Sequence, residues 1–213
     1  MRYPVRRLST LLLTAATLAL VGCTAITGIT DATRYYVLSP SSETSGASRT
    51  ALSSAGIGVG PVLIPGYLDR LQMVTRGAND ELEISTFHRW AEPLDSGIAE
   101  TLADNLAAQI GNERIAVFPW RGGVARVLDY QVTVVVLRFD GSPGRQVTLD
   151  ARWRLLGKEG RELALKRSTI NEPITGGGYE PLVRGMNRAI AALAREIGSE
   201  LQSRADTRAS GSS

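Results

Sequence analysis

The chain has 213 residues, of which 43% are hydrophobic and 21% charged, and its 24 lysines and arginines outnumber 21 acids by three. Three of the arginines stand in the first seven residues, so the rest of the chain has no net charge. It therefore has no excess of basic residues to bind the phosphates of a nucleic acid. A single cysteine excludes internal disulfides and cysteine-rich metal sites, so the core must be held by packing, for which one domain of this length suffices.

The N-terminus has the pattern of an export signal. Basic residues precede an apolar run from Leu11 to Leu20, which is shorter than the ~20 residues that cross a bilayer. The run ends in Leu20, Val21, Gly22 and Cys23, which resembles the lipobox of bacterial lipoproteins. That resemblance implies signal peptidase recognition at 20–22, removal of residues 1–22, and a diacylglycerol and an N-acyl chain on Cys23. An ordinary secretory peptide or a short hydrophobic anchor is the alternative.

The first half of the mature chain predicts a tether, several strands and one helix. Residues 23–34 are mostly small and form the predicted tether. Aromatic and β-branched residues predict strands at 34–38 and 57–64, on either side of a Ser- and Gly-rich loop at 40–55, and a hairpin of 71–76 with 81–84. A four-residue apolar repeat predicts a helix over 94–110, ended by Gly111 and followed by a strand at 115–118.

The second half carries the stronger strand pattern. Segments 128–139, 146–155 and 162–170 are separated by turns and predict an antiparallel meander. An amphipathic pattern predicts a last helix over 179–202, before a polar tail at 203–213 that we expect to be disordered. The expected fold is a single α+β domain over 35–202, a mostly antiparallel sheet with two amphipathic helices packed on one face.

Nothing in the sequence predicts a catalytic, metal or cofactor site. His88 is the only histidine and stands between aromatic residues, which favours a packing role. Gly56, Gly58 and Gly60 lack dinucleotide spacing and predict a strand that other backbone approaches closely. The glycines at 176–178 precede a helix, and such a position can form either an anion site or a hinge. The lysine of a Walker motif is missing, which favours the hinge.

One segment identifies a family. Arg89-Trp90-Ala91-Glu92-Pro93-Leu94-Asp95, with Thr101–Leu106, Tyr35–Leu38, Pro65–Arg70, Met73–Val74 and Gly178–Glu180, resembles the PqiC (YmbA) family of ABC-type transport auxiliary lipoproteins. The resemblance covers about residues 23–202. Trp90, Pro93 and Leu94 are therefore either structural or in contact with a partner, and we favour the structural role.

The resemblance implies a non-enzymatic part of a mammalian-cell-entry (MCE) lipid-transport system. Such a lipoprotein docks or caps a periplasm-spanning, PqiB-like MCE-domain protein at the outer membrane, as a ring-like homo-oligomer. Thr24 after the lipidated cysteine, in place of Asp, implies outer-membrane sorting on its periplasmic face. The alternatives are a stand-alone envelope hydrolase, which would need His88, and an outer-membrane assembly lipoprotein.

Overall fold

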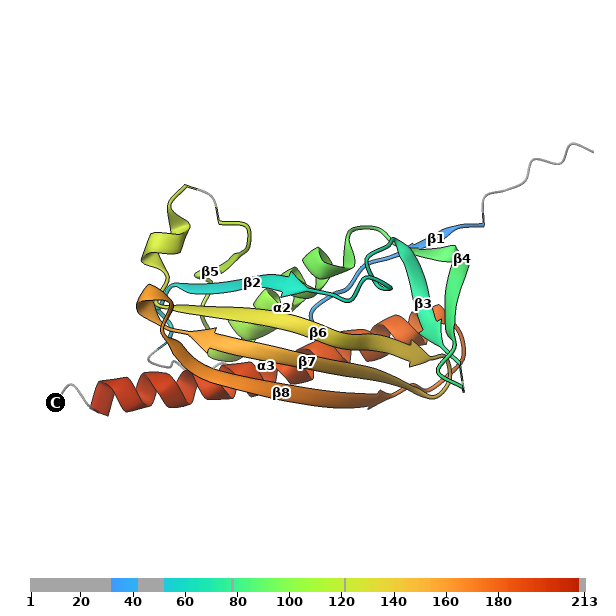
Figure 1. Ribbon diagram of the computed structural model, residues 1–213. Coiled ribbons are helices and arrows are strands. Elements are labelled where there is room, and N and C mark those ends of the chain that lie inside the picture. Colours follow the sequence, from blue (N-terminus) through green and yellow to red (C-terminus); the bar gives the residue numbers. More distant parts are fainter. Residues whose placement is uncertain (1–31, 42–51, 78, 121, 211–213) are drawn as a thin grey trace, which may run out of the picture. The chain divides into compact units, whose positions relative to one another are not determined.

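The computed structural model describes residues 32–41, 52–77, 79–120 and 122–210, which form two sheets and two long helices (Figure 1). The strands are β1 (Arg34–Tyr36), β2 (Ile57–Leu63), β3 (Gln72–Arg76), β4 (Leu82–Trp90), β5 (Ile115–Val117), β6 (Tyr130–Ser142), β7 (Gln146–Leu156) and β8 (Glu162–Pro173). The helices are α2 (Leu94–Ile110) and α3 (Tyr179–Ser210), with short 3-10 turns η1 (Val124–Val127) and η2 (Lys158–Gly160). The predicted α+β class is confirmed.

The larger sheet has five strands in the order β5-β2-β6-β7-β8. The predicted antiparallel meander is confirmed in β6, β7 and β8. However, β2 runs parallel to both of its neighbours, β5 and β6, so the sheet is mixed rather than purely antiparallel. Parallel neighbours need a long crossover connection. Between β2 and β5 the chain makes this connection through β3, β4 and α2.

A second, three-stranded sheet has the order β1-β4-β3, whereas the sequence predicted one sheet. The hairpin of β3 with β4 is antiparallel as predicted, but β4 continues to Trp90 and pairs in parallel with β1. The register shifts between the Val74–Ile84 and Gln72–Arg89 pairs. The extra residues of β4 form a bulge there, where apolar alternation is interrupted.

Both helices cover the same face of the five-stranded sheet, as predicted, and we call it the helix face (Figure 1). The α2 helix starts directly after Pro93 and ends at Gly111, whose φ of 64° is left-handed. Its apolar stripe packs against β2 and α3. From the sheet, Phe139 and Trp153 are fully buried, and the Trp153 indole N–H donates to the Ser168 hydroxyl at 2.9 Å. The core lies between this face and the helices.

The α3 helix extends to Ser210, so the segment 203–210 is helical and not the disordered tail that we expected. Its apolar stripe continues beyond the predicted end at 202, because Leu201 and Ala205 are both buried. An ion pair between Arg204 and Glu200, one turn apart, adds support. Residues 211–213 lie outside the described chain. Among the described residues, no helix is both long and apolar enough to span a bilayer.

The opposite, outer face of the five-stranded sheet is partly covered next to the glycines of β2. A Cβ atom at Gly56 would collide with the carbonyl oxygen of Val127, and one at Gly58 would lie 2.7 Å from the ring of Trp120. The predicted close approach of other backbone is therefore confirmed at Gly56. At Gly58 the neighbour is a side chain instead. The chain between β5 and β6 closes this end of the outer face.

Candidate functional site

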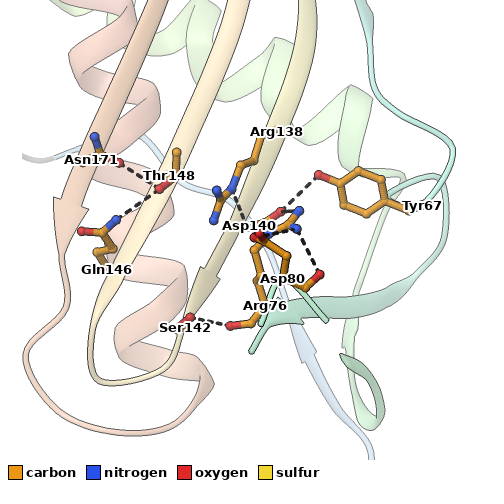
Figure 2. A network of polar contacts seen from close by, with 9 residues as sticks. All are labelled: Tyr67, Arg76, Asp80, Arg138, Asp140, Ser142, Gln146, Thr148 and Asn171. Atoms are coloured by element: carbon orange, nitrogen blue, oxygen red, sulfur yellow. Dashed lines mark hydrogen bonds and ion pairs between the residues drawn. The ribbon is translucent and has the colours of Figure 1, made fainter. Parts of the chain in front are cut away.

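A buried carboxylate joins the two sheets. Asp140 of β6 is fully buried and accepts two hydrogen bonds from Arg76 of β3, from Nε to Oδ1 at 3.0 Å and from Nη2 to Oδ2 at 2.7 Å (Figure 2). Arg138 Nε donates to Oδ1 at 2.9 Å, and the Tyr67 hydroxyl donates to Oδ2 at 3.1 Å. We call these four residues the Asp140 cluster. It fastens the three-stranded sheet to the outer face of the larger sheet.

The electrostatics of the Asp140 cluster agree with a permanent ion pair. Burial by itself would raise the pKa of the Asp140 carboxyl, but the hydrogen bonds and charges of Arg76 and Arg138 outweigh it and lower this pKa. The pKa of the Tyr67 phenol is raised by burial and by the Asp140 charge. Ser142 also donates to the carbonyl of Arg76. With four hydrogen bonds accepted and two guanidinium groups against its single charge, Asp140 is suited to hold the structure rather than to transfer a proton.

The outer face is open beyond the Asp140 cluster. A groove of about 440 Å³ crosses β2, β6, β7 and β8. Its floor includes Leu63, Val135 and Leu165, all exposed, and Arg152 and Arg154 line it as well. Leu63 and Val135 are register partners, and Val135 pairs in turn with Arg152. The outer-face groove therefore offers an apolar strip next to guanidinium groups, which suits an apolar segment that carries acidic groups.

A second open cleft, of about 880 Å³, surrounds His88. The His88 ring stacks on Tyr179 at the start of α3, with ring centroids 3.8 Å apart and planes 13° apart. The ring of Tyr36 of β1 also stacks on the His88 ring, with the ring centroids 5.8 Å apart. This aromatic stack ties β1 and β4 to the first turn of α3. Burial, followed by the charge of Arg34, lowers the pKa of the His88 imidazole, which favours its neutral form.

The surroundings of His88 do not resemble a catalytic triad. Its Nδ1 lies 3.1 Å from the Ser85 hydroxyl, which also accepts the backbone N–H of His88 at 3.0 Å. Both contacts close the bulge of β4. In the described part of the chain, no carboxylate forms a hydrogen bond or ion pair with His88, although a triad needs one to orient the imidazole. The expected packing role of His88 fits this geometry.

The residues singled out in the sequence fall into two groups. The lipobox residues Leu20, Val21, Gly22 and Cys23 lie outside the described residues. In the family segment, Trp90 is 4% exposed and Leu94 is 3% exposed, so both side chains belong to the core. Pro93 is exposed and occupies the position before the first turn of α2. Neither Trp90 nor Leu94 could reach a partner without leaving the core.

Sequence reasoning missed the Asp140 cluster. Asp140 precedes Gly141, Ser142, Pro143 and Gly144, a composition typical of turns, so the acid was assigned to a turn rather than to a strand. One signal was available: an acid directly after the apolar run of β6, with an arginine two residues before it. Across the described ranges, no group of three His, Cys, Asp or Glu side chains could hold a metal ion.

Known proteins resemble this chain over most of its length. The family of ABC-type transport auxiliary lipoprotein components matches residues 36–198. Two relatives, from Escherichia coli (strain K12) and Shigella flexneri, are each described as intermembrane transport lipoprotein PqiC. Each is 27% identical over 191 residues, which cover 87% of this chain and 96% of the relative.

Solved structures share the fold. The crystal structure of an uncharacterized protein has a TM-score of 0.63 at 21% identity and covers 79% of this chain and 98% of its own. A crystal structure from Xanthomonas campestris has a TM-score of 0.60 at 16% identity and covers 82% and 99%. The family match spans β2 to β8, α2 and the part of α3 up to residue 198. This chain therefore belongs to the ABC-type transport auxiliary lipoprotein family, to which PqiC belongs.

Proposed function

We propose that this protein is a lipid-anchored, non-enzymatic subunit of an intermembrane lipid transport system, which docks or caps a periplasm-spanning MCE-domain protein at the outer membrane. The observation that carries the proposal is the family match over residues 36–198. Both curated relatives are named as intermembrane transport lipoproteins. The stacked His88 and the Asp140 carboxylate, which two arginines hold, support a scaffold role, because neither is arranged for catalysis.

The outer-face groove is the surface that we assign to the MCE-domain partner. Its exposed Leu63, Val135 and Leu165 would be withdrawn from water by an apolar segment of the partner. Arg152 and Arg154 would meet acidic side chains next to that segment. The chain acts in this proposal as a ring-like homo-oligomer, whose mass in detergent can be measured by light scattering.

Co-purification tests this function. The lipidated chain should capture the MCE-domain protein encoded near its gene from detergent-solubilised envelopes, and failure to capture it would overturn the proposal. Leu63→Ser with Leu165→Ser should weaken the capture, whereas Tyr35→Ser with Phe87→Ser, on the other sheet, should leave it unchanged. A deletion strain that mislocalises outer-membrane proteins but keeps its lipid distribution would instead favour the assembly lipoprotein.

The anchor has its own test. In the proposal, Cys23 carries the acyl chains, so Cys23→Ala should yield a soluble periplasmic protein or an uncleaved precursor. Mass spectrometry of the mature wild-type chain should find the diacylglycerol and the N-acyl chain on residue 23. A Cys23→Ala chain of mature size that stays on membranes through detergent-free washing would contradict the anchor.

A further inference from the structure

Arg152 stands in the middle of the outer-face groove. It is the register partner of Val135 on β6 and of Arg167 on β8, and Val135 pairs in turn with Leu63 on β2. Register partners in neighbouring strands point to the same side of a sheet, so these four side chains form one row across the outer face. Leu63 is 56% and Val135 41% exposed. The Arg152 side chain therefore lines the groove together with apolar surface that is open to water.

The neighbouring arginines of this face have carboxylates of their own. Arg167 donates from Nε and Nη2 to the two carboxylate oxygens of Asp150, at 2.9 and 2.6 Å. Arg154 forms a looser ion pair with Glu162, at 3.6 Å. When a partner covers the groove, the charges of these two arginines are already compensated within the chain.

Arg152 differs from both of them. Among the described residues, its guanidinium forms no hydrogen bond and no ion pair. The pKa of Asp150 is lowered first by the hydrogen bonds from Arg167, and the charge of Arg152 only adds to this effect. Moreover, Arg152 and Arg167 are register partners of like charge, and such pairs repel. Three arginines share two carboxylates here, so one positive charge of the groove is not balanced by the chain.

This charge limits what can cover the groove. An apolar segment that lies over Leu63 and Val135 removes Arg152 from water as well, and a cation without a counter-charge is costly to bury. A carboxylate on that segment offsets the cost, because it can accept two parallel hydrogen bonds from a guanidinium. Arg154 makes no such demand, because Glu162 stays beside it.

We propose that Arg152 determines which partner the outer-face groove accepts, by requiring a carboxylate on the segment that covers it. The partner is the MCE-domain protein of the proposed function, on which this inference rests, and its segment over the groove must carry an Asp or a Glu. A similar protein with an apolar segment but no acid at this point is rejected, because it would leave the guanidinium buried and unpaired.

Binding of the purified MCE-domain partner to the lipidated chain in detergent tests this role. Arg152→Gln should weaken binding by about tenfold or more, and raising NaCl from about 0.1 M to about 0.5 M should weaken the wild type more than the variant. The matched control is Arg195→Gln on α3, behind the opposite face of the sheet. Arg195 is exposed, and its guanidinium forms no hydrogen bond or ion pair within the described chain. Its loss should change binding by less than about twofold.

Charge reversal identifies the carboxylate on the partner. Arg152→Glu should weaken binding more than Arg152→Gln, because it places two like charges against each other. Replacing the partner's Asp and Glu residues by Arg, one at a time, should restore binding to Arg152→Glu at one position. The same replacement should weaken binding to the wild-type chain. If no single replacement restores binding, the proposed pairing is wrong.

Unfolding in urea separates this role from a structural one. Arg152→Gln should unfold at the same or a slightly higher urea concentration than wild type, because it removes the repulsion from Arg167. A lower midpoint together with weaker binding would show that Arg152 supports the fold, and would overturn the inference. Equal binding of the wild type and Arg152→Gln would also overturn it, while the proposed function would stand. A wild-type chain that does not bind the partner would refute the proposed function itself.

Discussion

On its helix face the five-stranded sheet is closed by α2 and α3, which withdraw Phe139 and Trp153 from water. The three-stranded sheet is fastened differently, through the charged Asp140 cluster and the stack of His88 on Tyr179. The first region gains stability from apolar area, which is large and non-directional. The second adds a few directional contacts to the burial of Met73, Val74 and Trp90. It keeps Tyr35, Ile84 and Phe87 at the surface. The difference teaches that the larger sheet supplies the stable body, while the smaller one is fixed in orientation and left free to present a surface.

The largest expected effect is in the core of the five-stranded sheet. Phe139→Ala should destabilise the domain by about 3–5 kcal/mol, because it removes a fully buried ring and leaves a cavity. Urea unfolding measures the loss. Val135→Ala, on the exposed side of the same strand, should cost no more than about 0.5 kcal/mol. Equal losses in the two variants would contradict the division of β6 into a buried and an open face.

The next effect is at the junction of the two sheets. Asp140→Ala should cost about 3 kcal/mol, because it leaves Arg76 and Arg138 without the carboxylate that they share. Hydrogen exchange should then speed up in β3 and β4 much more than in β7. Asp150→Ala is the control, because its partner Arg167 is largely exposed, and it should cost less than about 1 kcal/mol. Uniform acceleration across all strands would show that the small sheet is not held separately.

The same junction predicts a pH dependence. The pKa of Asp140 is lowered in the folded state from its ordinary value of 3.8, so its stabilisation is complete above the unfolded pKa. This contribution is lost as the pH falls through the lower folded pKa. Asp140→Asn should therefore be less stable than wild type at neutral pH, and the gap should narrow below about pH 4. Urea unfolding over a pH series measures the gap, and a gap that stays constant in acid would contradict the ionised cluster.

The smallest effect concerns the aromatic stack. His88→Ala should cost about 1 kcal/mol, because it removes the ring that packs on Tyr179, and His88→Phe should restore most of the loss. Thermal unfolding of the two variants measures this. Both should retain envelope function in a complementation assay. Loss of function in a well-folded His88→Phe protein would revive the hydrolase alternative, since only the imidazole chemistry would then be missing.

Several features could be predicted because they are local. The four-residue repeat from Leu94 to Ile110 and the glycine after it determine α2, with the same bounds in the structure. The alternation between 146 and 156 gives β7 its buried and exposed faces, and the turns beside it determine the meander. The family segment around Trp90 and Pro93 could also be recognised in the sequence, and burial of Trp90 and Leu94 is what apolar residues at the start of a helix favour.

The pairing of β2 with β5 and β6, the separate small sheet and the Asp140 cluster were decided only by the tertiary structure. An apolar run records that a strand is buried, but not which strand lies beside it or in which direction. Arg76 and Asp140 are 64 residues apart, and the residues next to either of them in the sequence do not indicate that the two form an ion pair. Periodicity is a property of adjacent residues and can be read from the chain, whereas strand partners and buried ion pairs are chosen by the competition of all segments for one core.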